Sequence, residues 1–227
     1  MNLAIITARG GSKRIPRKNI RPFLGRPILA YPIEAALNSG LFAEVMVSTD
    51  DEEIADIARS FGATVPFLRS AATSDDRATT SQVLEEVLAG YEGVGQPFGY
   101  ACCLYPTAPF VSETLLAQAL EKLRAGRYDC VFPVQRFGFP VQRALVFEGD
   151  RLQWLQPENA LVRSQDLAPA FHDTGQFYFF DVAAFRQSGR LLSDNTSGLE
   201  ISELQAHDID TEDDWRVAEF KFKLAQL

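Results

Sequence analysis

The chain has 227 residues, of which 46% are hydrophobic, so it can bury a sizeable core and is most simply one domain. Its net charge of -8 argues against nucleic acid as the main partner. No apolar run approaches the ~20 residues that cross a bilayer, and no secretory signal pattern is present, so we expect neither a membrane protein nor a secreted one. Three cysteines, Cys102, Cys103 and Cys130, lie in apolar runs and suit buried thiols in a reducing cytoplasm better than disulfides or a zinc site.

Short apolar strands and amphipathic helices alternate as far as Val134. The expected strands lie at 3–6, 44–48, 64–68, 98–105 and 129–134. The expected helices lie at 28–39, 79–91 and 113–125, and a further helix runs to Phe61 from a capping box formed by Thr49 and Glu52. This order of elements predicts an α/β protein with a mostly parallel sheet and helices on both of its faces.

The pattern changes at Arg136. We expect a hairpin over 145–155, with its turn at 148–150, and then a loop-rich segment that reaches Thr174. Long loops of this kind usually serve as lids, binding loops or arms that reach a partner. The remaining elements are expected to be a strand at 176–181, a helix at 182–188, extended segments at 199–204 and 207–209, and a last helix capped by Thr211.

A basic, glycine-containing loop follows the first expected strand, in the string ARGGSKRIPRKN that begins at Ala8. It contains no acidic residue and five cations, which are Arg9, Lys13, Arg14, Arg17 and Lys18. Backbone N–H groups near two glycines, combined with concentrated positive charge, suit a polyanion such as a nucleoside triphosphate. The same residues also suit a simple turn on a solvated basic surface. Neither the GxxxxGK[ST] nor the GxGxxG spacing is present, so this is not a standard phosphate or dinucleotide motif.

Taken whole, ARGGSKRIPRKN resembles the N-terminal signature of the cytidylyltransferases that activate eight- and nine-carbon 2-keto sugar acids, the CMP-sialic acid synthetase family. Three later segments, FPVQRAL at 139–145, RSQDL at 163–167 and HDTGQFY at 172–178, are similar to the pseudaminic acid cytidylyltransferase branch of that family. The resemblance therefore extends from Leu3 to the last expected helix.

This resemblance implies a three-layer, Rossmann-like nucleotidyltransferase fold over 1–227, with a mixed, mostly parallel sheet and a dimerisation and sugar-binding insertion at about 136–175. It implies a homodimeric enzyme that transfers CMP from CTP to the anomeric hydroxyl of a nonulosonic acid, pseudaminic acid, and releases pyrophosphate. The alternatives are a cytidylyltransferase for sialic, legionaminic or 3-deoxy-octulosonic acid, and a non-catalytic nucleotide sensor that has kept the fold.

The resemblance also assigns residues to the nucleotide site. Arg9 and Lys13 are expected to stabilise charge on the transferring and leaving phosphates. The other expected nucleotide contacts are Ser12, Lys18 and Asn19 in the same loop, with Arg69 and Ser81 at the base or ribose. Arg69 and Ser81 lie in segments that equally suit the start of a helix. The family usually has proline at the position of Thr7, a difference at a strand end from which we expect little consequence.

On the acceptor side, the expected sugar contacts are Tyr105, Gln142, Arg163, Gln176 and Tyr178. Tyr105 stands in the string YPTAP, where sialic acid synthetases generally carry glutamine; it also suits an ordinary aromatic at a strand end. Because alternate residues of a strand face opposite sides, we expect at least one of the aromatic residues 177–179 to belong to the core.

A carboxylate pair, Asp208 and Asp210, precedes the last expected helix. Residues two apart on an extended segment face the same side, and paired carboxylates suit Mg²⁺. On the residues alone, a role for Asp210 as the helix N-cap is the slightly stronger interpretation. The family resemblance favours Asp208 and Asp210 as metal ligands, with Asp210 a candidate general base through a metal-bound water. His207 is interpreted as a structural neighbour of the pair.

Overall fold

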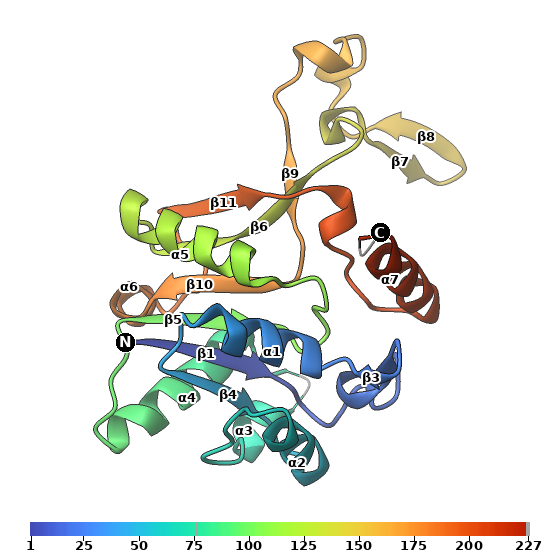
Figure 1. Cartoon of the computed structure of the whole chain (residues 1–227). Coiled ribbons are helices and arrows are strands. Elements are labelled where there is room, and N and C mark those ends of the chain that lie inside the picture. Colours follow the sequence, from blue (N-terminus) through green and yellow to red (C-terminus); the bar gives the residue numbers. More distant parts are fainter. Residues whose placement is uncertain (76, 226–227) are drawn as a thin grey trace.

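The structure, a computed structural model, describes residues 1–75 and 77–225. Its centre is a mixed sheet with the strand order β11-β6-β10-β5-β1-β4 (Figure 1). These strands are β1 (Asn2–Thr7), β4 (Glu44–Ser48), β5 (Tyr100–Leu104), β6 (Cys130–Arg136), β10 (Phe177–Asp181) and β11 (Thr196–Glu200). Of these six, β10 is antiparallel to both of its neighbours, and the other pairs are parallel. The expectation of a mixed, mostly parallel sheet is therefore confirmed.

Helices cover both faces of this sheet, as expected from the alternation of strands and helices. The helices are α1 (Ala30–Ser39), α2 (Glu52–Ser60), α3 (Ala71–Ser74), α4 (Thr80–Gly93), α5 (Glu113–Gly126), α6 (Val182–Ser188) and α7 (Glu212–Leu224). Ala4 and Ile6 of β1 pack with α1 and α5, while Leu3 and Ile5 pack with α4 and α6 on the opposite face. This period of two makes β1 apolar on both sides and explains its unbroken apolar sequence.

Two predicted features of the segment after β4 are wrong. The strand expected at 64–68 is reduced to a single bridge between Met46 and Thr64, because Pro66 has no N–H with which to extend a ladder. The N-cap of α2 is Asp51, whose Oδ1 accepts the Ile54 N–H at 3.1 Å. Thr49, the residue predicted for this role, is fully buried and accepts the Asp51 N–H instead.

At the other sheet edge, β11 lies earlier than predicted. It pairs in parallel with β6 over Thr196–Glu200, and a 3₁₀ turn at Glu203–Gln205 replaces the end of the predicted extended segment. Gly198 permits this close pairing, because a Cβ at that position would lie 2.8 Å from a methyl group of Val134. Polar and small residues therefore form an edge strand that an apolar pattern could not indicate.

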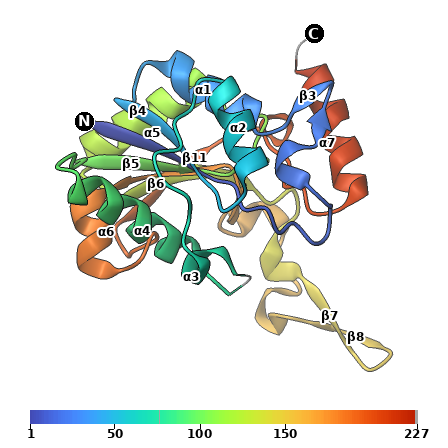
Figure 2. The same cartoon turned by 90° about the horizontal axis from the view of Figure 1, so that it is seen from below.

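Residues 137–170, here called the arm, connect β6 to β9 (Phe171–Asp173) and project from the sheet (Figures 1 and 2). The strands β6 and β9 pair antiparallel at the base of the arm. It carries the predicted hairpin, formed by β7 (Leu145–Glu148) and β8 (Arg151–Trp154), with Gly149 in the left-handed region at φ 66°. Large apolar side chains are exposed on the arm, among them Phe139 at 60%, Phe147 at 74% and Leu161 at 98%.

The remaining elements are short. Strands β2 (Pro22–Phe23) and β3 (Arg26–Pro27) form a small hairpin beside α7 (Figure 1).

The thiols of Cys102, Cys103 and Cys130 are buried and free, as predicted. No helix within the described residues has both the length and the apolar character needed to span a bilayer.

Candidate functional site

A cavity of 410 Å³ lies at the carboxyl ends of β1 and β5, the edge where ligands bind in open α/β sheets. Its lining comes from the basic loop after β1 and from the turn after β5: Thr7, Arg9, Ser12, Lys13, Arg14, Ile15, Lys18, Asn19, Tyr105, Pro106 and Thr107. Within the described part of the chain, this lining contains four cations and no carboxylate. The cavity therefore favours an anionic ligand, and it brings together six of the predicted site residues.

The basic loop is closed by Asn19, a buried residue whose Nδ2 donates to the Arg9 carbonyl at 2.8 Å. A bond from the Ser12 N–H to the Gly10 carbonyl at 3.0 Å tightens the glycine turn, and a 3₁₀ turn over Lys18–Ile20 ends the loop. Asn19 thus has a structural task in the loop besides the nucleotide contact predicted for it.

A small apolar cluster brings the loop to the segment before α7. Ile15 of the loop and Ile209, which lies between the two aspartates, are both buried in this cluster with Trp215 of α7. Each buried isoleucine contributes on the order of 1.5–3 kcal/mol. Single apolar residues therefore anchor two highly charged segments that are almost 200 residues apart along the chain.

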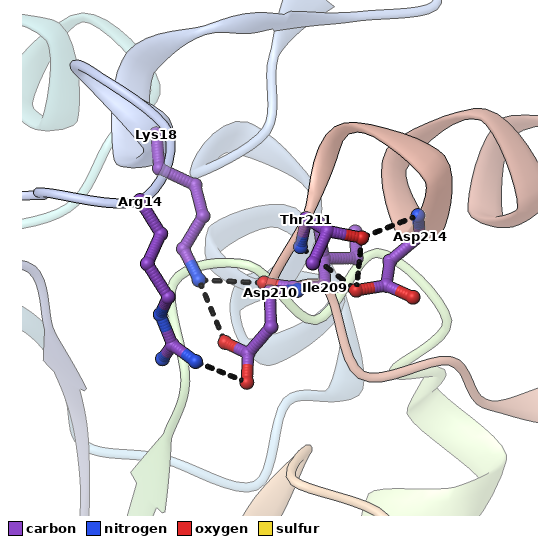
Figure 3. Close-up of polar contacts among 6 residues, drawn as sticks. All are labelled: Arg14, Lys18, Ile209, Asp210, Thr211 and Asp214. Carbon is purple, nitrogen blue, oxygen red and sulfur yellow. Dashed lines mark hydrogen bonds and ion pairs between the residues drawn. The ribbon is translucent and has the colours of Figure 1, made fainter.

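The charged side chains of these two segments meet directly (Figure 3). Lys18 Nζ donates to the Ile209 carbonyl at 2.6 Å and lies 3.7 Å from Asp210 Oδ1. Arg14 Nη1 donates to Asp210 Oδ2 at 2.7 Å. Burial lowers the pKa of Lys18, and the charges of Asp210 and Asp208 oppose this shift. Burial also raises the pKa of Asp208, and the negative charge of Asp210 raises it further.

The cap of α7 is Thr211, as expected, and the alternative role of Asp210 as a helix cap is wrong. Thr211 Oγ1 accepts the Asp214 N–H at 3.2 Å, and Asp214 Oδ2 accepts the Thr211 N–H at 2.8 Å (Figure 3). Asp210 takes no part in the capping box through its carboxylate, which instead pairs with Arg14 and Lys18, two residues that line the cavity.

The Asp208–Asp210 pair is the cation site that the sequence predicted. The described residues hold no cluster of three or more histidine, cysteine or acidic side chains able to bind a metal ion. Two carboxylates suit Mg²⁺, which takes its other ligands from water and substrate phosphates. His207 is half-buried next to the pair, and burial lowers its pKa.

A second cavity, of 190 Å³, shares Thr7 and Arg9 with the first and is also lined by Arg69, Thr73, Asp75, Ala78, Thr80 and Val83. The Arg69 guanidinium is buried and fixed, because it donates to the Ser48 carbonyl at 2.7 Å and to Ser48 Oγ at 3.1 Å. Ser81 is not part of this lining, whereas Thr80 is. The sequence offered no signal for choosing between these neighbouring hydroxyls.

Tyr105, in the turn after β5 that lines the first cavity, is held by the start of β10. Its N–H donates to the Gln176 carbonyl at 2.9 Å, and its ring contacts the Tyr178 ring edge-on, with centroids 5.7 Å apart. The Tyr178 hydroxyl donates to the Asp173 carboxylate. Burial raises the pKa of both tyrosines, so both phenols are neutral near pH 7.

Gln176 is buried, and its Nε2 donates to the Gln205 carbonyl at 3.1 Å. The aromatic residues beside it alternate as expected: Phe177 and Phe179 pack on one face of the sheet, and Tyr178 packs on the other.

Gln142 and Arg163 are not brought to Tyr105 within one chain. Both lie on the projecting arm, where Gln142 Nε2 donates to the Ala168 carbonyl at 2.8 Å and Arg163 pairs with Asp166 at 2.8 Å. Arg14 is the opposite case, because it lines the cavity and pairs with Asp210 although no site role was predicted for it. Its position among the loop cations was the signal that could have identified it.

Comparison with known proteins places these features in context. Residues 3–190 match a family model described as cytidylyltransferase. The chain is 40% identical to a pseudaminic acid cytidylyltransferase of Campylobacter jejuni, over 98% of this chain and 97% of that protein. It is 30% identical to a CMP-N,N'-diacetyllegionaminic acid synthase of Legionella pneumophila, over 99% of this chain and 97% of that protein.

Among solved structures, the fold matches a CMP:2-keto-3-deoxy-manno-octonic acid synthetase complexed with CTP. The TM-score is 0.71 at 18% identity, and the match covers 99% of this chain and 98% of the other. A 4-diphosphocytidyl-2C-methyl-D-erythritol synthase from Anaerococcus prevotii matches with a TM-score of 0.64 at 15% identity, over 98% of both chains. These two likenesses establish the fold.

Urea denaturation can test whether Thr211, and not Asp210, caps α7. Thr211→Ala should lower the free energy of unfolding by about 0.5–2 kcal/mol, the usual cost of losing an N-cap side chain. Asp210→Asn should change it by less than about 1 kcal/mol, because the pair with the largely exposed Arg14 is solvent-screened and Lys18 keeps its hydrogen bond to the Ile209 carbonyl. A greater loss in Asp210→Asn than in Thr211→Ala would contradict the assigned cap.

Proposed function

Because the chain belongs to the cytidylyltransferase family, we propose that it transfers CMP from CTP to the anomeric hydroxyl of pseudaminic acid and releases pyrophosphate. The observation that carries the proposal is the 410 Å³ cavity lined by the basic loop, whose Arg14 and Lys18 also contact Asp210. The acceptor is proposed from the similarity, along almost the whole chain, to a relative named for that sugar.

The loop cations would bind and orient the triphosphate. Arg9, Lys13 and Arg14 line the cavity from one side, so an in-line attack of the sugar hydroxyl on the α-phosphorus would come from the side of Tyr105. Fixed positive charges act mainly on the negative charge that builds up on the leaving pyrophosphate. Lys18, bound to the Ile209 carbonyl, would hold the far end of the loop against the aspartate segment.

The nucleoside would occupy the second cavity. Arg9 lines both cavities, so a ligand that spans them would place its phosphates against the loop and its base near Arg69 and Thr80. The buried Arg69 guanidinium is already fixed by Ser48, so it would shape this cavity without moving on ligand binding.

Mg²⁺, held by Asp208 and Asp210, would supply further neutralisation of phosphate charge when bound. Arg14 and Lys18 balance the charge of Asp210 in the free protein. Arg14 is largely exposed and the pair is solvent-screened, so Arg14 can turn from Asp210 to a phosphate at little cost.

Carboxylate-to-amide substitutions test the role of the aspartate pair. Asp208→Asn and Asp210→Asn should each lower kcat by on the order of a hundredfold, since metal charge stabilisation contributes several kcal/mol. The Mg²⁺ concentration needed for half-maximal rate should also rise. Asp213→Asn, which removes an exposed carboxylate on α7, is the matched control and should behave as wild type. Normal Mg²⁺ dependence in both variants would refute the metal assignment.

A homodimer would bring the arm of one chain to the site of the other. Exposed apolar patches of this kind usually mark interaction surfaces, and the arm concentrates several large side chains, including Phe139 and Phe147. Gln142 and Arg163 lie on this arm away from their own chain's Tyr105, so they would contact the sugar of the partner subunit.

Analytical ultracentrifugation should therefore give twice the mass of the 25.2 kDa chain. Phe147→Asp on the arm should shift the protein to monomer and reduce activity in parallel. Phe220→Asp, on the exposed face of α7, is a matched control with similar exposure, 69% against 74%, and should leave the dimer intact. A monomeric wild type with full activity would contradict the shared site.

Acceptor preference tests the sugar assignment. Pseudaminic acid has a terminal methyl and two N-acyl groups, whereas sialic acid has a hydroxylated tail. A tail hydroxyl packed against an aromatic face such as that of Tyr105 would find no hydrogen-bond partner there, at a cost of roughly 1–3 kcal/mol per unpaired polar group. Pyrophosphate release with CTP should therefore show a kcat/KM at least about tenfold higher for pseudaminic acid than for sialic acid.

The outcomes separate the alternatives. A preference for another keto sugar acid would reassign the acceptor and leave the cytidylyltransferase activity intact. CTP binding without pyrophosphate release for any sugar acid would support a nucleotide sensor instead.

A further inference from the structure

Arg17 is a cation of the basic loop that lines neither cavity. Its guanidinium points to the start of α2, where Nη1 donates to Asp51 Oδ2 at 2.5 Å and Nη2 pairs with Glu53. Its backbone lies in the left-handed region at φ 55°, a conformation that non-glycine residues rarely adopt and that persists only where surrounding contacts hold it. The two carboxylates supply those contacts.

The opposite end of the loop is tied to the same place. The Gly10 N–H donates to Asp50 Oδ1 at 2.8 Å. A Cβ at Gly10 would lie only 2.8 Å from Asp51 Oδ2, so any other residue here would displace this carboxylate. The acidic residues at the start of α2 therefore hold the loop at Gly10 and at Arg17, on either side of Ser12, Lys13 and Arg14.

Asp51 is itself fixed, because its other oxygen, Oδ1, caps α2 by accepting the Ile54 N–H. One carboxylate thus joins the helix to the loop, and the position of α2 sets the position of Arg17. Opposite charge at this point also offsets the repulsion among the loop cations, which face the cavity.

We propose that Arg17 and Asp51 are positioning residues for the triphosphate of CTP. They hold the loop backbone between Gly10 and Arg17 in the conformation that receives phosphate. The loop therefore loses little conformational entropy when the nucleotide binds. The proposal rests on the proposed function of the loop. Since the ion pairs are partly exposed, their removal changes nucleotide binding far more than global stability.

The informative variants are Arg17→Gly, which keeps the left-handed backbone without strain but removes both ion pairs, and Asp51→Asn, which keeps the cap acceptor but removes the charge. Each should raise the KM for CTP, and the Kd for CTP measured by calorimetry without sugar acid, by about tenfold. The KM for the sugar acid and the melting temperature should stay at wild-type values. The double variant should be no worse than the poorer single variant, because both act through one contact.

Arg59→Ala is the matched control, because Arg59 lies on α2 with similar exposure and pairs with Asp56 at 2.9 Å on the helix surface. Its KM for CTP should not change. Arg17→Lys should fall between wild type and Arg17→Gly, since it keeps one positive charge near Asp51.

Wild-type CTP affinity in both Arg17→Gly and Asp51→Asn would overturn the proposal, as would equal losses for CTP and sugar acid together with a lower melting temperature. If the CTP affinity of Arg17→Gly equalled that of wild type and exceeded that of Arg17→Lys, only the backbone conformation at this position would matter, and the ion pairs would not. Absence of CTP binding in the wild-type protein would instead refute the proposed function.

Discussion

The small apolar cluster around Ile15, Ile209 and Trp215 is the constraint on which the site depends. A loop with five cations and a segment with two aspartates would each be well solvated on its own, and surface ion pairs alone contribute little. One buried isoleucine in each segment holds the two segments together, and the charged neighbours of these isoleucines then meet directly beside the cavity. Hydrophobic burial thus sets the geometry in which the electrostatics act.

The sheet supplies the second half of the site through one antiparallel strand. Because β10 runs against β5, its first residues lie beside the last residues of β5, and Gln176 meets Tyr105. The chain reaches β10 only after passing through the arm, which leaves by β6 and returns by β9. The arm and the Tyr105 side of the cavity are therefore connected through consecutive residues, Asp173 to Tyr178.

Much of the fold could be predicted from periodicity and capping. The strand Glu44–Ser48 and the helix Val182–Ser188 form as predicted, because each combines an apolar pattern with clear end signals. The failures have local physical causes. Pro66 interrupts an apolar strand pattern, and Asp51 caps the helix in place of Thr49, which is buried and whose carbonyl accepts the Arg69 N–H.

The site was predictable where residues are close in sequence and not where tertiary placement decides. The basic loop lines one cavity as expected, but the outward direction of Arg17 depends on α2, and the choice of Thr80 over Ser81 depends on the phase of α4. Gln142 and Arg163 match a sequence motif, and an arm was one of the roles expected for their segment, but the motif alone could not show that the segment projects away from the chain's own cavity.

The three buried thiols have a practical consequence for studying this fold. Cys102 and Cys103 lie in β5 and Cys130 begins β6, on both sides of β10 at the centre of the sheet. Burial raises the pKa of the Cys103 thiol to about 12 and raises that of the other two as well, so alkylating reagents meet neither a thiolate nor an accessible sulfur in the native state. Covalent labelling of these sulfurs requires the sheet to open. The labelling rate therefore reports how often the centre of the protein opens.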